Sequence, residues 1–471
     1  MAFWNRRKSV DIADHGGQRL KATLSWPHLV AMGVGAIVGT GIYTLTGVGA
    51  GLAGPAVLIS FGICGVLCAC AALCYAEMAT LIPAAGSAYT YSYAVLGELL
   101  AWIVGWSLIL EYTVAAAAVA IGWAGHFTAF IVAAGWHVPP QVLHGLMDGG
   151  LINLPAVAIS GFVTLLLVLG TRESATLNIV LVLIKLSALT LFVVLAVQSF
   201  NSANFHPFAP FGYGATPDGH GRNFGALGAA AIVFFAFYGF DAVSTAAEET
   251  KNPGRNLTIG IVGSMALCTA IYMIVAATAV GALPFQAFST VHDEAPLVHI
   301  LHVLQHPLAA QLIAAAVVIA IPSVILVLMY GQSRIFFVMA RDGLLPQRLA
   351  AVHKTRGTPV LMTLVTGAVV AALAAVFNLD KIVELANAGT LCAFIAVAAS
   401  MLVLRLRDPA RPRVFRAPLP WIVGPACVLG CLYLFVVGLP AFTQTAFLIW
   451  NGIGLVVYFA YGMRASRLAK S

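Results

Sequence analysis

Residues 32–43 read Met-Gly-Val-Gly-Ala-Ile-Val-Gly-Thr-Gly-Ile-Tyr, and this stretch decides the fold that we expect. Its four glycines each weaken an apolar helix by about 1 kcal/mol relative to alanine. A dinucleotide-binding loop is excluded, because Val38 stands where its third glycine belongs and no soluble strand precedes the stretch. Close helix packing explains Gly35 and Gly39, but it explains Gly39-Thr40-Gly41 poorly, because adjacent residues cover several faces of a helix. The stretch therefore predicts a membrane helix that is interrupted near its middle.

A second interruption is expected in residues 234–244, Phe-Phe-Ala-Phe-Tyr-Gly-Phe-Asp-Ala-Val-Ser. They place Gly239 and Asp241 at the centre of another apolar run. Two interrupted helices, one early in each half of the chain, are the sequence sign of a secondary transporter built from inverted repeats. We expect the repeats to be spans 1–5 and spans 6–10.

The composition places the whole chain in a membrane. Of 471 residues, 61% are hydrophobic and 9% are charged, and the mean hydropathy is +0.96. These values exclude a soluble globule, a disordered chain and a secreted disulfide scaffold. Apolar runs of about 20 residues, long enough for the ~30 Å hydrocarbon core of a bilayer, recur along the chain. We expect twelve spans, at residues 27–52, 55–82, 98–125, 153–170, 175–199, 223–248, 257–281, 308–340, 359–377, 383–405, 419–438 and 442–463.

The 24 Lys and Arg residues are divided unequally between the two sides of this arrangement. Twenty fall in the two chain ends and in loops that follow even-numbered spans, whereas only Arg222 and Lys381 fall in loops on the other side. Because positive residues are retained in the cytoplasm, we expect both termini there. The positive net charge is thus a topology signal, to which anionic lipid headgroups contribute, and nothing in the pattern indicates a nucleic-acid partner.

An interrupted helix exposes backbone groups that lipid cannot satisfy, so each interruption must line a cavity. The free N–H groups at the start of the second half-helix attract an anion such as a carboxylate. The free C=O groups at the end of the first half-helix attract a cation such as an ammonium. A zwitterionic amino acid satisfies both ends, and this predicts the class of substrate.

Three charged residues lie midway along spans: Glu111 in span 3, Lys185 in span 5 and Asp241 in span 6. Each costs about 2.5–3.5 kcal/mol at the bilayer centre, so each is a candidate functional residue. Lys185 is a proton carrier or a partner in a structural ion pair with Asp241 or Glu111. Asp241 contributes to the substrate site or caps the second half of span 6. Glu111 contacts a basic substrate side chain or forms a buried hydrogen bond to span 1 or span 6.

At these residues the chain resembles an amino acid permease of the amino acid–polyamine–organocation superfamily, and it is most similar to bacterial members of the cationic amino acid transporter family. The resemblance covers residues 26–463. The motifs that carry it are Gly35–Tyr43, Tyr75-Ala76-Glu77-Met78 with Pro83, Gly86 and Tyr89, Phe240–Glu249, Tyr330–Arg334, and Met339–Pro346.

The resemblance implies a fold of two inverted five-helix repeats plus two further helices. It implies that the substrate carboxylate binds at Thr40 and Gly41, where Gly39 shapes the break. It implies that the carbonyls of Ile37, Phe235 and Tyr238, near Asp241, hold the ammonium group. By the same resemblance, Lys185 matches a proton-coupling lysine and Glu111 an acid near the substrate side chain.

The sequence therefore predicts an all-α polytopic membrane protein of twelve transmembrane helices. We expect a cytoplasmic N-terminal segment at 1–25, a ten-helix transport core at 26–405, two additional helices at 406–463 and a cytoplasmic tail at 464–471. No metal site is expected, since in span 2 Cys64 and Cys68 point away from Cys70 and Cys74, which indicates packing. No cofactor is expected either.

We expect a proton-coupled importer in the inner (plasma) membrane, not an enzyme, for cationic amino acids such as arginine and lysine or for a broad set that includes alanine. Its expected partners are the L-amino acid substrate, protons and membrane lipids. The sequence leaves open whether a small accessory membrane subunit also binds. An amino acid exchanger is the alternative within the transporter class. A channel or a transport-like sensor is the alternative outside it; a channel needs a continuous polar lining and a sensor a soluble output domain, and neither is evident in the sequence.

Overall fold

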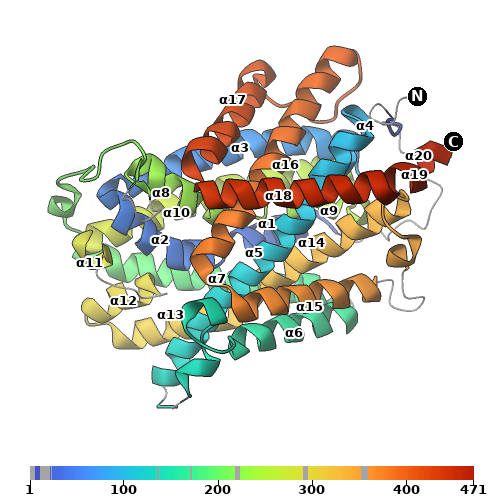
Figure 1. Cartoon of the computed structure of the whole chain (residues 1–471). Coiled ribbons are helices and arrows are strands. Elements are labelled where there is room, and N and C mark those ends of the chain that lie inside the picture. Colours follow the sequence, from blue (N-terminus) through green and yellow to red (C-terminus); the bar gives the residue numbers. More distant parts are fainter. Residues whose placement is uncertain are drawn as a thin grey trace.

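The computed structural model describes residues 6–10, 22, 24–133, 135–136, 138–169, 172–217, 223–289, 295–351 and 359–470. Over these residues the chain forms one bundle of helices (Figure 1). Most of the predicted N-terminal segment 1–25, the outer-loop residue Arg222 and Ser471 of the tail lie outside the described residues.

The first half of the chain contains the interrupted first span and four further long helices. The elements are α1 (Trp26–Ile37), α2 (Thr40–Ala53), η3 (Gly54–Ala56), α3 (Val57–Leu81), α4 (Ser87–Val95), α5 (Glu98–Ala133), η4 (Pro140–Val142), η5 (Leu146–Asp148), α6 (Leu154–Leu169), α7 (Arg172–Ala196), η6 (Val197–Ser199) and η7 (Ser202–Phe205).

The second half opens with a two-stranded hairpin, β1 (Thr216–Pro217) and β2 (Asn223–Phe224), paired antiparallel with Thr216 opposite Phe224. Then follow α8 (Ala226–Val233), η8 (Phe234–Phe237), α9 (Ala242–Thr245), η9 (Ala247–Glu249), α10 (Pro253–Ala282), α11 (Gln286–Ser289), α12 (Pro296–Val303), α13 (Pro307–Ala320), α14 (Pro322–Arg341), η10 (Gln347–Ala350), α15 (Val360–Val376), α16 (Leu379–Arg407), α17 (Pro420–Tyr433), η11 (Leu434–Gly438), α18 (Ala441–Val457), η12 (Tyr458–Gly462), α19 (Met463–Ala465) and α20 (Arg467–Lys470).

Nine helical segments of the described residues are long and apolar enough to cross a bilayer. The first, Trp26–Leu81, is 56 residues long and contains two of the predicted spans. Two shorter apolar helices, α6 and α15, lie where spans 4 and 9 are predicted. A mostly helical membrane protein is therefore confirmed, whereas the count of twelve spans stays a prediction.

The structure differs from the predicted spans in two places. Predicted span 8 is divided into α13 and α14 at Ile321, because Pro322 has no N–H with which to continue the helical hydrogen bonds. The connection between predicted spans 2 and 3, to which no span was assigned, forms a fully buried helix, α4.

The two ends of the described chain meet at one end of the bundle. The Arg6 guanidinium donates to the carbonyl of Met463 at 3.0 Å, and Arg6 also pairs with Glu98 at 3.5 Å. Chain ends on the same side require an even number of crossings, which agrees with the predicted topology.

Candidate functional site

The first span is interrupted at Val38 and Gly39, as predicted. Val38 is extended (φ −74°, ψ 92°) and Gly39 is also extended (φ −140°, ψ −153°), so α1 ends at Ile37 and α2 begins at Thr40. No side chain caps the start of α2. Its first backbone N–H groups therefore lack partners within the helix, and together they form a positive end.

The sixth span is interrupted between η8 and α9, again as predicted. Tyr238 is extended (ψ 144°), and Gly239 has a φ of +108°, a conformation that side chains disfavour. Asp241 stands at the N-cap of α9, yet its side chain makes no capping hydrogen bond. The capping role that the sequence left open for Asp241 is therefore not formed.

The two breaks are packed directly against each other, and glycine makes this possible. A Cβ at Gly41 would lie 2.4 Å from the Cα of Ala236, and one at Gly239 would lie 2.7 Å from the Cβ of Ala36. Side chains at these positions would force the two backbones apart. The breaks thus form one buried unit at the centre of the bundle.

Tyr272 of α10 joins the two breaks through one hydroxyl group. This oxygen lies 2.7 Å from the carbonyl of Ile37 and 2.9 Å from the carbonyl of Ala236. The carbonyl of Phe235 accepts the backbone N–H of Tyr238 at 3.2 Å, so the predicted ammonium-binding carbonyls of Ile37 and Phe235 each already accept one hydrogen bond. Each carbonyl has a second lone pair to offer. Tyr272 was missed by the sequence reasoning, since a tyrosine in an apolar span carries no distinguishing signal.

Two buried carboxyl groups lie beside the breaks. Asp241 Oδ2 accepts from the Tyr112 hydroxyl at 2.5 Å, and Glu111 Oε1 accepts from Thr390 at 3.0 Å. Neither residue is exposed, and the two carboxyl groups interact electrostatically. Asp241 Oδ1, Glu111 Oε2 and the Tyr238 hydroxyl have no hydrogen-bond partner among the described residues. The hydrogen bond to Glu111 Oε1 thus comes from α16, and the Tyr238 hydroxyl of span 6 also interacts with the Glu111 carboxyl.

Lys185 lies on the other side of α1 and contacts its C-terminal turn. Its ammonium donates to the carbonyl of Gly35 at 2.8 Å, and Asn178, also on α7, donates to the carbonyl of Ala31 at 3.1 Å. A cation at the carbonyl end of a helix is favoured by the helix dipole. The ion pair with Asp241 or Glu111 that the sequence left open for Lys185 is not formed among the described residues.

Ion pairs connect the C-terminal end of span 6 to α14. Glu249 accepts from Arg334 at 3.3 Å and from the hydroxyl of Tyr330, whose ring lies 3.6 Å below the Arg334 guanidinium carbon. Glu248 pairs with Arg341 at 3.4 Å. The motif residues Tyr330–Arg334 and Glu248–Glu249 thus join two elements on one side of the breaks.

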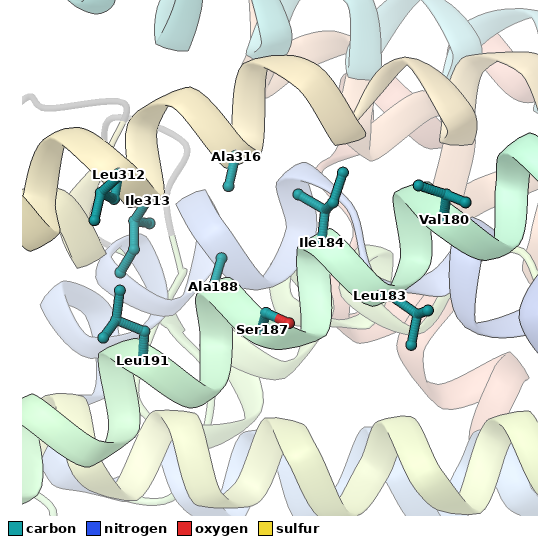
Figure 2. A pocket seen from close by; sticks show the side chains of 9 residues that line it. All are labelled: Val180, Leu183, Ile184, Ser187, Ala188, Leu191, Leu312, Ile313 and Ala316. Carbon is teal, nitrogen blue, oxygen red and sulfur yellow. The ribbon is translucent and has the colours of Figure 1, made fainter.

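A cavity of about 370 Å³ lies away from this centre, between α7 and α13. Figure 2 shows its lining, which is apolar apart from Ser187 and includes Ile184 and Ile313. A second cavity, of about 510 Å³, is lined by Thr80 and Leu81 of α3 and by residues 408–414. Neither cavity contacts a predicted site residue, so both belong to other surfaces of the bundle.

Comparison with known proteins places the chain beside permeases. The profile of a family described as amino acid permease matches residues 24–459. The "Branched-chain amino acid permease BcaP" of Bacillus subtilis (strain 168) is 41% identical over 472 residues, covering 98% of each chain. The "Methylthioribose transporter" of the same organism is 40% identical over 470 residues, covering 99% of each. "Cationic amino acid transporter 2, vacuolar" of Arabidopsis thaliana is 38% identical over 86% of this chain and 63% of its own.

Proposed function

This chain belongs to the amino acid permease family, and from that premise we propose that it takes up L-amino acids together with protons across the bacterial plasma membrane. The chain is a membrane transporter and not an enzyme, as are the relatives named above. The observation that carries the proposal is the pair of facing breaks, because it brings a positive and a negative helix end to one buried place.

The substrate's two charged ends fit the two kinds of free backbone group. The carboxylate binds the N–H groups at Thr40 and Gly41, at the start of α2, where no side chain competes. The ammonium binds the carbonyls of Ile37, Phe235 and Tyr238 near the unpartnered oxygen of Asp241. Tyr272 supports this arrangement by aligning the carbonyl of Ile37.

Lys185 couples transport to protons in this proposal. Its ammonium holds α7 to the last turn of α1 through the Gly35 carbonyl. Removal from water disfavours a charged lysine, so Lys185 can lose its proton within the bilayer. The neutral amine makes a weaker hydrogen bond, and α1 is then released to move between the inward and outward states.

Glu111 sets the preference among substrate side chains. Its Oε2 is buried without a partner, which suits the cationic end of arginine or lysine. The named substrates of the two Bacillus relatives are a branched-chain amino acid and methylthioribose, neither of which carries a cationic side chain. We therefore propose, as an alternative to cationic amino acids, a broad set of amino acid substrates that includes alanine.

The architecture that we propose has twelve spans, with spans 1–5 and 6–10 as inverted repeats and both chain ends in the cytoplasm. The meeting of Arg6 with Met463 supports the even number. Rocking of the two broken spans against the remaining helices gives alternating access.

A binding screen tests the proposal. Purified protein is titrated with the twenty amino acids and with methylthioribose at two pH values, and uptake is then followed in liposomes with and without an inward proton gradient. Binding of amino acids and gradient-driven uptake are expected. If uptake occurs only when the liposomes are preloaded with an amino acid, the protein is an exchanger and not a symporter. Preferential binding of methylthioribose would reject amino acids as the substrate class.

Glu111→Gln tests the side-chain preference in the same assay. Loss of the negative charge is expected to weaken the binding of arginine and lysine about tenfold relative to alanine, since one charge-assisted contact is lost. An unchanged ranking of the three amino acids would remove Glu111 from substrate selection.

A further inference from the structure

Span 6 carries a polar stripe from its break to the end of the bundle where the chain ends meet. Asp241, Ser244 and Glu248 follow one another along α9 and η9, and we call these three residues the polar stripe. The Ser244 hydroxyl lies 2.6 Å from the carbonyl of Asp241 and 2.8 Å from the Ser87 hydroxyl. Glu248 accepts from the backbone N–H of Ala85 at 3.2 Å. Ser244 and Glu248 therefore face α4 and the turn that precedes it, whereas the Asp241 carboxyl binds Tyr112 of α5.

Ser87 occupies a backbone conformation that a serine rarely adopts. Its φ is +50°, and it is fully buried at the start of α4. Such left-handed positions favour glycine, and non-glycine residues persist there where surrounding contacts require them. Here the contact is the hydroxyl pair with Ser244, so the chain retains a polar side chain at this point at the cost of backbone strain.

Two tyrosine hydroxyls reach the same region without a protein partner. Tyr75 of α3 and Tyr91 of α4 are both fully buried, and neither hydroxyl has a hydrogen-bond partner among the described residues. Their rings meet edge to face with centroids 6.4 Å apart, and Tyr75 also packs against Phe240 and Phe394, each at 5.7 Å. Both hydroxyls interact electrostatically with Asp241. Packed rings therefore fix the two hydroxyls beside the polar stripe.

We propose that these hydroxyls line a water-binding path that carries protons between the buried carboxyl of Asp241 and the cytoplasmic side along span 6. The inference rests on the proposed proton coupling, to which it adds Asp241 as a second proton-binding group beside Lys185, with its route to bulk water. A buried water is held by about two to four polar partners, and the hydroxyls of Tyr75, Tyr91, Ser244 and Ser87 supply them within one cluster. The Tyr75 and Tyr91 hydroxyls can each donate one hydrogen bond and accept another, so a proton passes along the waters that they hold without a lasting change in either. Ser244, whose hydrogen points to the Asp241 carbonyl, holds such a water only as an acceptor.

The charged and titratable groups around the path determine where the proton enters and leaves. Tyr75 interacts electrostatically with Asp241, Glu111, Tyr91 and Cys427. Tyr91 interacts with Ser244 and with Asp241. At the far end, the Glu248 carboxylate is paired with Arg341. The proton therefore enters at the carboxyl of Asp241 and leaves past the Glu248–Arg341 pair, where the separation of that pair opens the path to bulk water.

The test uses full-length protein in liposomes and the variants Tyr75→Phe, Tyr91→Phe and their combination. Phenylalanine keeps the ring packing and removes only the hydroxyl. Proton-driven uptake of the best-binding amino acid from the screen is expected to fall roughly tenfold or more in the double variant. Counterflow of the same amino acid, which requires no net proton release, is expected to keep its wild-type rate. Tyr433→Phe, which removes a hydroxyl from a lipid-facing tyrosine of α17, is the matched control.

Each other outcome overturns a specific statement. If both variants take up the amino acid at the wild-type rate under a proton gradient, the path is rejected and the proposed proton coupling stands. Equal loss of gradient-driven uptake and counterflow would mean that the hydroxyls serve the substrate site or the fold, and it would also reject the path. Wild-type uptake that does not respond to a proton gradient would reject proton coupling, and the path with it.

Discussion

At the scale of single residues, the carbonyl end of α1 has two specialised partners. Lys185 binds the carbonyl of Gly35, and the Tyr272 hydroxyl lies against the carbonyl of Ile37. The last carbonyls of any helix lack partners within it, and one left unsatisfied in a membrane costs several kcal/mol. The carbonyl of Gly35 is satisfied by an ammonium, which can lose its charge. The carbonyl of Ile37 is satisfied by a hydroxyl, which stays neutral. This difference is the reason why we propose proton coupling for Lys185 and alignment of the carbonyl for Tyr272.

Lys185→Ala is expected to abolish proton-driven uptake, because it removes the ammonium that we propose as the carrier of the coupled proton. The measurement is uptake into liposomes over a range of external pH. Asn178→Ala is the control, since it removes the neighbouring α7–α1 hydrogen bond without removing a charge. Normal uptake with a normal pH dependence in Lys185→Ala would contradict the coupling role.

At the scale of elements, the site depends on how closely two broken helices approach. Gly41 lies against Ala236, and Gly239 lies against Ala36, so each break supplies one glycine to the contact with the other. Tyr272 of α10 then spans both carbonyls. Because the contact is made by backbone atoms, a single added methyl group changes the distance between the elements.

Gly239→Ala is expected to destabilise the protein by roughly 1–3 kcal/mol and to weaken substrate binding. The positive φ strains an alanine, and the new Cβ would lie 2.7 Å from that of Ala36. Thermal unfolding in detergent and amino acid titration measure the two effects. Gly452→Ala in α18 meets nothing within 4 Å, and because alanine favours a helix over glycine it should be at least as stable as the wild type. Equal stability of the two variants would show that the breaks tolerate separation.

At the scale of the whole molecule, α18 is attached to the core by a stack of tryptophans. Trp106 stacks on Trp450 with centroids 4.9 Å apart, and each indole N–H donates to the other's carbonyl at 2.9 Å. Trp102 stacks on Trp106 and donates to the carbonyl of Gly454 at 2.8 Å. Figure 1 shows α18 lying across α5. This attachment makes α18 part of the same rigid frame as α5, which carries Glu111 and Tyr112.

Trp450→Ala is expected to lower the free energy of unfolding by about 3 kcal/mol, through the lost stack and the lost hydrogen bond from the Trp450 indole N–H to the carbonyl of Trp106. The thermal unfolding temperature in detergent provides the measurement. Trp421→Ala at the start of α17 is the control, because that side chain is 57% exposed. A comparable loss in both variants would mean that tryptophan burial in lipid, not the stack, provides the stability.

The sequence by itself determined the membrane class, the two interrupted spans and the three central charges. These features are local: hydropathy, glycine spacing and a charge in an apolar run act on neighbouring residues, so a single stretch of chain reveals them. The positions of both breaks followed from residues 32–43 and 234–244 alone.

Only the tertiary structure decided which groups each charge meets. Asp241 meets Tyr112 across 129 residues, Lys185 meets Gly35 across 150 and Glu111 meets Thr390 across 279. The burial of α4, the hydroxyl of Tyr272 between both breaks and the unpartnered hydroxyls of Tyr75 and Tyr91 likewise depend on packing between distant helices. The physical reason is that a polar side chain in an apolar span must find a partner, but the local pattern does not specify which of the surrounding helices provides it.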